Sequence, residues 1–114
     1  MPRRPGVVLE DILATISLVE SAIGTKDRAA FAADLFLQRG VERSLEIISE
    51  AVRHLPEAIL ATRPEIAWAD IRSIGNLIRH EYWRVDPDIL WAVITDDLPP
   101  LRMAIEAMLK PVDE

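Results

Sequence analysis

The stretch Ile71–Asp86, I-R-S-I-G-N-L-I-R-H-E-Y-W-R-V-D, decides how the rest of the chain is organised. On a helix of about 100° per residue, its apolar residues form one stripe and its chemically capable polar residues lie on the other side. The stripe consists of Ile71, Ile74, Ile78 and Tyr82, and the other side of Arg72, Asn76, Arg79, His80 and Trp83. Guanidinium, amide and imidazole groups together can hold a phosphate and move a proton near neutral pH. The stretch therefore predicts an amphipathic helix that carries the functional site.

The chain before this stretch predicts a loose tail and three helices. Residues 1–6 contain two prolines and a glycine and are expected to be irregular. Apolar residues at spacings of three and four predict a helix over 7–23, which ends at Gly24 as its C-cap. Thr25 is the expected N-cap of a second helix that reaches about Gln38.

The second helix is expected to face inward through Phe31, Leu35 and Phe36. A break or kink is predicted at 39–40, and a third helix over 41–54. Its buried stripe is predicted to be Val41, Leu45, Ile48 and Val52.

The remaining chain predicts a short helical turn at 56–61, a loop at 63–65 and the key helix over 68–83. Asp86 followed by Pro87 is typical of a helix start. Asp96 or Asp97 is expected to cap a last segment over 98–110. No stretch alternates like a strand, so we predict an all-α, up-and-down bundle of four to six helices.

Composition limits the classes of function. The 114 residues, half of them apolar, make one domain, 1–114. A net charge of −6 is unlike that of a non-specific nucleic-acid binder, so an RNA ligand would need a local basic patch. The absence of cysteine excludes disulfides and thiolate metal sites. No apolar run spans a bilayer, and Glu10 and Asp11 interrupt any secretory core, so we expect a cytoplasmic protein without a membrane partner.

Several short motifs carry a family resemblance. These are G-N-L-I-R-H-E-Y at 75–82, D-I-L-W at 88–91 and D-D-L-P-P-L at 96–101, preceded by D-I-L at 11–13, A-F-A-A-D at 30–34, R-S-L-E-I-I-S-E-A at 43–51 and P-E-I-A-W-A-D-I-R at 64–72. In this order and spacing the chain resembles the HepT-like ribonucleases of the HEPN superfamily. The family signature is an arginine, four to six residues and then H-x-Y. Here H-x-Y is His80, Glu81 and Tyr82, whereas Gly75 occupies the usual position of the arginine.

The resemblance implies a HEPN-type homodimer in which two copies of the motif helix line one cleft. It implies a metal-independent endoribonuclease that acts as the toxin of a type VII-like toxin–antitoxin pair with a minimal nucleotidyltransferase. His80 would be the general base or acid, and Asn76, one turn away, would fix its tautomer. In some family members the partner attaches AMP to the motif tyrosine, which is Tyr82 here. No cofactor is implied.

The replacement of the family arginine by Gly75 leaves two interpretations open. We expect Arg79, beside His80, to hold the scissile phosphate in its place, with Arg72 as second candidate and Arg84 as a further phosphate ligand. Arg53, on another helix, is expected to matter little. The alternative is a binding module that has lost cleavage and still docks a nucleotidyltransferase or a nucleotide, with Gly75 serving close helix packing. A purely structural helical adaptor is a third interpretation.

Other residues have simpler interpretations. Trp68 and Trp91 are expected to be core or interface anchors rather than stacking platforms for bases. His54, next to Leu55 and Pro56, is expected to be structural or exposed. Glu46 and Glu50 have the i, i+4 spacing of metal ligands, but no Glu-x-x-His completes such a site. We therefore predict no metal site.

Overall fold

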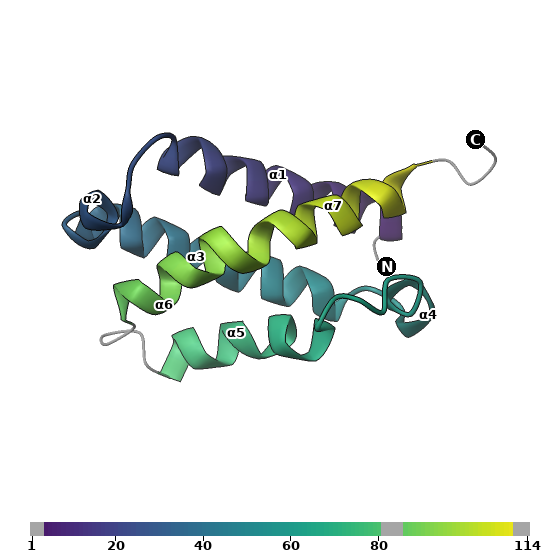
Figure 1. The fold of residues 1–114 in the computed structure, drawn as a ribbon. Helices are drawn as coiled ribbons and strands as arrows, with labels where there is room; N and C mark the ends of the chain where they lie inside the picture. Colours follow the sequence, from purple (N-terminus) through teal and green to yellow (C-terminus); the bar gives the residue numbers. More distant parts are fainter. Residues whose placement is uncertain (1–3, 81–85, 111–114) are drawn as a thin grey trace.

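The computed structural model describes residues 4–80 and 86–110, and only the backbone of residues 79 and 80. Its helices are α1 Pro5–Ile23, α2 Arg28–Ala32, α3 Leu35–Arg53, α4 Glu57–Leu60, α5 Trp68–His80, α6 Pro87–Ala92, the π-helical turn η1 Val93–Asp97 and α7 Leu98–Leu109 (Figure 1). The described segments contain no strand. The predicted all-α helical bundle is confirmed.

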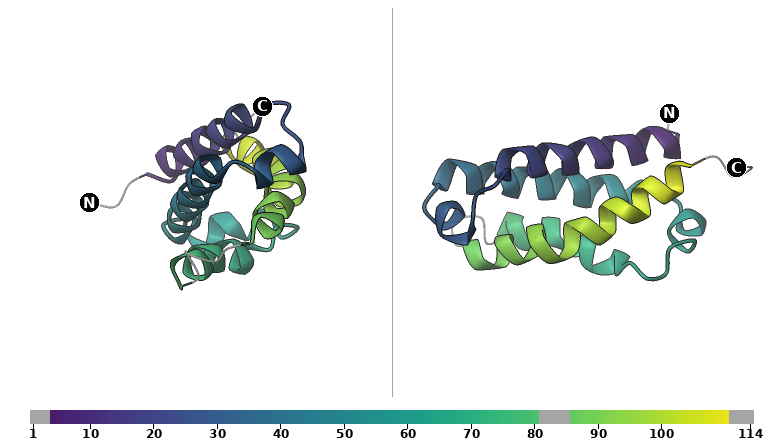
Figure 2. Two further views of the ribbon diagram at one scale, coloured as in Figure 1. Left: turned by 90° about the vertical axis from the view of Figure 1, so that its left-hand side faces the viewer. Right: turned by 45° about the horizontal axis from the view of Figure 1, so that its top comes forward.

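The long helices lie side by side along a molecule of 46 × 30 × 26 Å (Figure 1). α3 is central, because it packs against α1 on one side and α5 on the other, and α7 covers α1. α3 and α5 run in opposite directions and form the most extensive helix–helix contact in the described part of the chain (Figure 2). The functional stretch is therefore held directly against the centre of the bundle.

The core follows the helical periodicity of the sequence. All four residues of the predicted α3 stripe, Val41, Leu45, Ile48 and Val52, are buried. Phe31 from the short α2 is fully buried, and its ring centroid lies 5.5 Å from that of Trp91. On α5, Ile78 is buried while Ile71 and Ile74 are partly buried against the same core. The apolar side of the key helix thus faces inward as predicted, and Tyr82 lies outside the described residues.

The first helix begins two residues earlier than predicted. Pro5 occupies its first turn, where the missing N–H costs nothing and the fixed φ angle suits a helix. The predicted tail of residues 1–6 is therefore too long, and residues 1–3 lie outside the described part. Gly24 ends the helix with a φ of 55°, a conformation that glycine adopts without strain, so its predicted role is confirmed.

The predicted second helix is wrong in both its start and its length. Asp27, rather than Thr25, caps α2 by accepting from the Ala30 N–H at 2.9 Å. Asp34 then caps α3 by accepting from the Leu37 N–H at 3.0 Å, and α3 continues to Arg53 without a break at 39–40. Because the boundary lies at 33–34, Leu35 and Phe36 start a new helix and are 60% and 89% exposed rather than inward-facing.

The C-terminal helices are continuous. Asp86 caps α6 through a 2.8 Å bond from the Asp88 N–H, as predicted. Asp97 has helical dihedral angles and no side-chain cap bond, so the expected cap before Leu98 is absent. Pro99 and Pro100 explain the π-turn, because their rings would clash with carbonyls four residues earlier in a regular helix. The wider turn of η1 accommodates them.

None of the described helices is long and apolar enough to cross a membrane.

Candidate functional site

Ser49 joins α3 to the backbone of α5. Its Oγ donates to the Arg72 carbonyl at 2.9 Å and accepts from the Gly75 N–H at 3.2 Å. Both Ser49 and Gly75 are buried. A hydroxyl on a short side chain reaches the facing backbone only where the two helices are close, and the lack of a side chain at position 75 permits this approach. The Ser49–Gly75 contact thus fixes the register between the two helices.

This contact decides what position 75 can hold. Gly75 is buried against α3 rather than open to a cleft. A larger side chain at a buried position is expected to crowd its neighbours, and overpacking of this kind costs about 1–3 kcal/mol. Gly75 therefore lies at the close contact between α3 and α5, where a larger side chain would compete with α3 for space.

Arg72 lies at the edge of the site and is half-buried. Its Nη1 lies 3.1 Å from Glu57 Oε2 on α4, and Glu57 is exposed. The Arg72 carbonyl also accepts from Arg53 Nη2 at 2.9 Å. Exposed ion pairs are worth about 0–1 kcal/mol, so a phosphate can compete for this guanidinium. Arg53 is on another helix and is expected from the sequence to matter little, but its guanidinium contacts the backbone of the motif helix.

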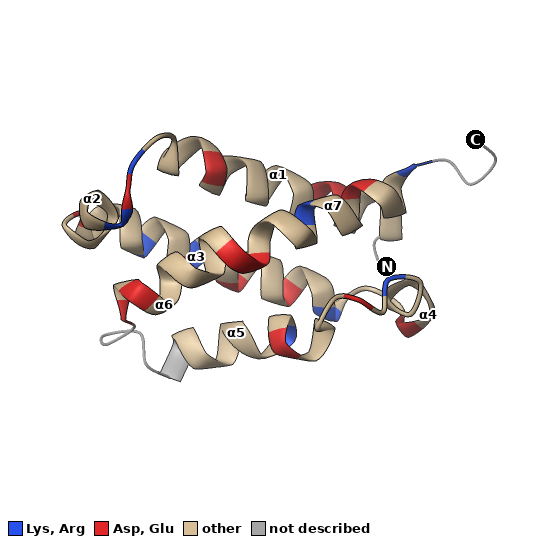
Figure 3. Cartoon of the chain, in the orientation of Figure 1, with Lys and Arg blue, Asp and Glu red and all other residues tan. Residues whose placement is uncertain are grey.

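The outward side of α5 carries Asn76, which is exposed four residues before the helix ends at His80. Leu77 beside it is 48% exposed. Within residues 68–78 of α5, the charged residues are Asp70 and Arg72, in the first turns of the helix (Figure 3). The basic patch that RNA binding needs therefore depends on the last turn of α5 and on the residues after it.

The structure brings together only part of the predicted site. Arg72 and Asn76 lie on α5 with described side chains, and Arg79 and His80 are placed by their backbone in its last turn. Tyr82, Trp83 and Arg84 lie outside the described residues.

Glu42 is a polar residue that the sequence analysis missed. Its side chain is 7% exposed, and its Oε2 accepts from Arg39 Nη1 at 2.9 Å. Burial raises the pKa of the Glu42 carboxyl above its ordinary value, against the opposing charge of Arg39, and Glu46 adds to the rise. One signal of this burial was available in the sequence. Glu42 precedes Ser49 by seven residues, which puts both residues on the same side of α3.

The carboxylates considered as metal ligands form ion pairs instead. Glu46 Oε1 lies 3.6 Å from Arg43 Nη1. Glu50 lies 3.2 Å from His54 Nε2, and both side chains are exposed. Among residues 4–80 and 86–110, no group of three or more potential ligands is close enough to hold a metal ion.

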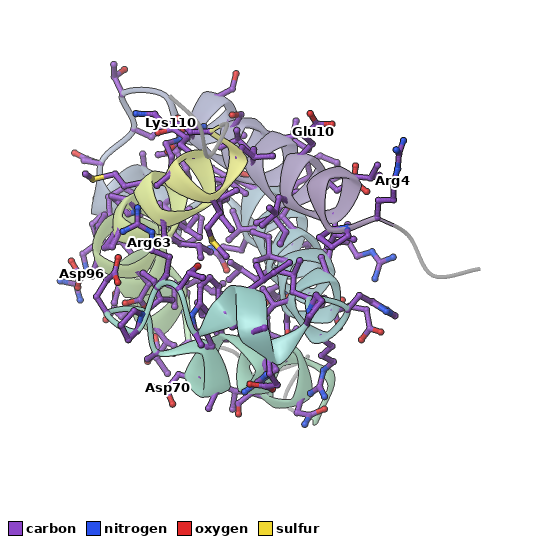
Figure 4. All side chains as sticks on the ribbon, turned by 90° about the vertical axis from the view of Figure 1, so that its right-hand side faces the viewer. Arg4, Glu10, Arg63, Asp70, Asp96 and Lys110 are labelled. Atoms are coloured by element: carbon purple, nitrogen blue, oxygen red, sulfur yellow. The ribbon has the colours of Figure 1, made fainter. Side chains whose placement is uncertain are left out.

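A groove of about 480 Å³ lies away from the motif, between the 63–66 segment and α7 (Figure 4). It is lined by Arg63, Glu65, Ile66, Pro100, Met103, Ala104, Glu106, Ala107 and Lys110. Arg63 pairs with Glu65 at 3.3 Å, and Glu106 pairs with Arg102 at 3.0 Å. The groove is at the end of the bundle where α5 begins, whereas His80 is at the other end (Figure 1).

The chain is similar to known proteins over most of its length. The family model "Ribonuclease HepT-like" matches residues 12–108. A protein of Thermococcus cleftensis described as "Probable ribonuclease HepT" is 33% identical over 102 residues, which cover 90% of this chain and 93% of the relative. A protein of Caldanaerobacter subterraneus subsp. tengcongensis, described as a candidate RNase, is 30% identical over 95% of this chain and 96% of the relative.

A longer protein of Methanocaldococcus jannaschii combines a gamma-glutamylcyclotransferase with a candidate RNase in its description. It is 30% identical over 95% of this chain, which covers 49% of its length. No solved structure matches the chain significantly. The family match spans most of α1 to α7 and includes the complete motif helix. The chain belongs to the ribonuclease HepT-like family.

Proposed function

We propose that the protein is a metal-independent endoribonuclease that acts as the toxin of a type VII-like pair with a minimal nucleotidyltransferase. Membership of the ribonuclease HepT-like family supports RNA as the substrate. The observation that carries the proposal is the motif helix α5, which is fixed to α3 through Ser49 and directs Asn76 outward. His80 follows Asn76 by four residues, so the two residues lie on neighbouring turns of the same helix.

The reaction uses the hydroxyl that RNA itself supplies. The 2′-oxygen bonds to the adjacent phosphorus while the bond from phosphorus to the 5′-oxygen breaks. His80 takes the proton of the 2′-hydroxyl, and a proton returns to the leaving 5′-oxygen. The products are a 2′,3′-cyclic phosphate and a 5′-hydroxyl. Arg79 stabilises the negative charge that develops on the phosphate, and Asn76 orients the imidazole.

Binding of the RNA strand is assigned to Arg72 and Arg84, on either side of the catalytic groups in the sequence. One guanidinium group can bind two phosphate oxygens at once. This suits recognition of the RNA backbone, which does not depend on the bases. Arg72 exchanges its exposed partner Glu57 for a phosphate at small cost.

A homodimer is part of the proposal. The chain has a net charge of −6, so one copy is a poor RNA binder, whereas two copies of Arg72, Arg79 and Arg84 at one seam concentrate positive charge. Leu77, which is exposed beside Asn76, is an apolar side chain that a dimer contact on this side of α5 would bury. Sedimentation at micromolar protein concentration measures the oligomeric state, and finding only monomer would contradict the proposed dimer.

Cleavage is expected to proceed in excess EDTA, because the nucleophile needs no metal-activated water. Purified protein is incubated with radiolabelled RNA, and the cyclic phosphate ends are identified by their resistance to direct ligation. The His80→Ala protein, prepared in parallel, controls for contaminating nucleases. Loss of cleavage in EDTA with recovery in magnesium or manganese would refute metal independence, and equal cleavage by His80→Ala would refute the assignment of the site.

Tyr82 is expected to accept AMP when the protein is co-expressed with a minimal nucleotidyltransferase. The added phosphate places negative charge two residues after His80 and repels an incoming RNA strand. Mass spectrometry should find the adduct on the peptide that contains Tyr82, the only tyrosine of the chain, and Tyr82→Phe should remove it. An adduct found only on another residue would overturn this assignment.

A binding module without cleavage is the second candidate, and the burial of Gly75 favours it. Gly75 supplies no cation, and its buried N–H is bonded to Ser49 on α3. If Arg79 does not replace it, His80 lacks a partner for the charged transition state. A wild-type protein that binds RNA or a nucleotidyltransferase and yields no cyclic phosphate would establish this function.

A further inference from the structure

The N-terminal half of α3 exposes a large aromatic side chain to solvent. Phe36 is 89% exposed, more than any other large apolar side chain in the described part of the chain, although the sequence predicted it to face inward. Its neighbour Leu35 is 60% exposed. Adjacent exposed apolar side chains are informative, because such patches commonly form part of a binding site. The other exposed residues of this half of α3 indicate what it binds.

The exposed charges on this face are all positive. Between positions 35 and 47, the exposed residues are Leu35, Phe36, Arg39, Gly40, Arg43 and Ile47. The side chain of Arg43 is 73% exposed and that of Arg39 is 47% exposed. The two carboxylates of the same segment are less accessible, with side-chain exposures of 7% for Glu42 and 21% for Glu46. A chain with a net charge of −6 thus has, on α3, a face that presents cations to solvent.

Phe36, Arg39 and Arg43 are spaced so that they can act together. Residues three, four and seven positions apart on a helix lie on the same side. The rise per residue puts Arg39 about 4.5 Å and Arg43 about 10.5 Å along the helix axis from Phe36. Arg43 Nη1 lies 3.6 Å from Glu46 Oε1, which is too long for a hydrogen bond, so this guanidinium is held only loosely.

This face lies at the end of the bundle where the motif helix ends. α3 begins where α5 ends, because the two helices run in opposite directions (Figure 1). Ser49 bonds to the backbone of Arg72 and Gly75, and Arg43 is six residues, or about 9 Å, closer to the start of α3. An equal distance along α5 from the same bonds leads to its last turn, which contains His80. An RNA strand bound at the motif can therefore continue along α3.

We propose that this face of α3 is a binding subsite for single-stranded RNA, in which a base stacks on Phe36 while Arg39 and Arg43 hold the neighbouring phosphates. The inference rests on the proposed function and extends it from the scissile bond to the strand beside it. Every base has a flat π face, so stacking on an exposed aromatic ring binds a strand without reading its sequence. The two guanidinium groups supply the positive charge that attracts the RNA backbone to an otherwise acidic protein.

Fluorescence anisotropy with a labelled single-stranded oligouridine tests the subsite, with the His80→Ala protein in EDTA as the parent so that the RNA stays intact. Phe36→Ala should weaken binding by roughly tenfold, the order of effect of removing one stacking aromatic side chain. Phe36→Leu should weaken it nearly as much, because leucine is apolar but has no π face. Arg43→Ala should weaken binding and reduce the slope of log Kd against log salt by about 0.7, the value for one phosphate contact on a single strand.

Two matched controls and a second probe complete the experiment. Met103 on α7 is 70% exposed, and Arg63 lies beside the groove at the other end of the bundle. Met103→Ala and Arg63→Ala should bind the oligouridine as the parent protein does. Annealing the oligouridine to its complement removes the free base faces, so Phe36→Ala should have little effect on binding of the duplex.

Two results would overturn the proposal. The first is that Phe36→Ala and Arg43→Ala bind the oligouridine as tightly as the parent protein. The second is that Phe36→Leu restores the binding that Phe36→Ala loses, while sedimentation shows a dimer for Phe36→Leu and a monomer for Phe36→Ala. The face would then be a contact between two copies of the chain.

The subsite and the proposed function can fail separately. A protein that binds RNA through Phe36 but cleaves none would keep the subsite and reject the endoribonuclease. Cleavage by the wild-type protein with a KM that Phe36→Ala leaves unchanged would reject the subsite alone.

Discussion

Arg79→Ala should slow RNA cleavage by about a hundredfold, which corresponds to about 3 kcal/mol of lost transition-state stabilisation. His80 alone can move a proton, but it cannot neutralise the charge that develops on the phosphate. Position 75 is filled by a glycine packed on α3, so the cation must come from elsewhere in the motif. Arg79 is adjacent to His80 in the last turn of α5. Single-turnover cleavage of a defined RNA measures the loss, and His80→Ala should show an effect at least as large.

The choice of control follows from the geometry of the bundle. Arg53 is unsuitable, because its guanidinium donates to the Arg72 carbonyl on the motif helix. Arg63→Ala is a better control, since Arg63 pairs with Glu65 beside the groove at the other end of α5. Arg63→Ala should cleave at nearly the wild-type rate. If Arg79→Ala also does so, Arg79 is a surface residue and the role passes to Arg72.

Gly75→Arg provides an independent comparison. Restoring the family arginine is expected to destabilise the fold rather than to raise activity, because Gly75 is buried against Ser49. If wild type lacks cleavage and Gly75→Arg gains it, the protein is the binding module and not the enzyme.

Trp68→Ala should lower the free energy of unfolding by about 3–5 kcal/mol, the usual cost of removing a buried aromatic side chain. Trp68 is buried at the start of α5, where its Nε1 donates to the carbonyls of Leu60 and Arg63, each at 3.0 Å. The indole therefore fills the core and also joins the segment after α4 to the motif helix. A domain of this size has a total stability of about 6–17 kcal/mol at the usual 0.05–0.15 kcal/mol per residue. Urea denaturation followed by circular dichroism measures the change.

Trp68→Phe separates the two contributions of the indole. It keeps most of the apolar volume and removes the N–H, while the Leu60 and Arg63 carbonyls keep the backbone N–H groups of Arg63 and Ile66 as donors. It should therefore cost about 0.5–1.5 kcal/mol, the net contribution of a typical hydrogen bond. Equal losses for both variants would assign the whole effect to the hydrogen bonds. A loss below about 1 kcal/mol for Trp68→Ala would show that the α4–α5 connection does not depend on this residue.

The hydrophobic periodicity determined the helical class and most of the core. The spacing of Val41, Leu45, Ile48 and Val52 requires one buried side whatever the helix packs against, and all four are buried. Gly24 and Asp86 act through their own backbone and side-chain chemistry, so their roles as helix terminator and N-cap followed from the sequence. The family resemblance placed the motif on one helix, and the family match confirms that membership.

The choice among competing caps depended on tertiary structure. Thr25, Asp27 and Asp34 are all acceptable N-cap residues. The free energies of capping that they offer differ by less than the packing of the helix can contribute. Burial of Phe31 fixes α2 as a short helix and moves the next start to Asp34. The exposure of Leu35 and Phe36 follows from that start, and no local pattern distinguishes it.

The candidate site divides in the same way. The sequence determined which groups lie on α5, because a helix places Arg72, Asn76, Arg79 and His80 by spacing alone. Only the tertiary structure showed that the buried Gly75 N–H donates to Ser49 Oγ and that Glu42 on α3 is buried. Those facts depend on the register of two helices that are separated along the chain. Register is set by side-chain fit between facing surfaces, and a pattern of spacings along one helix does not contain it.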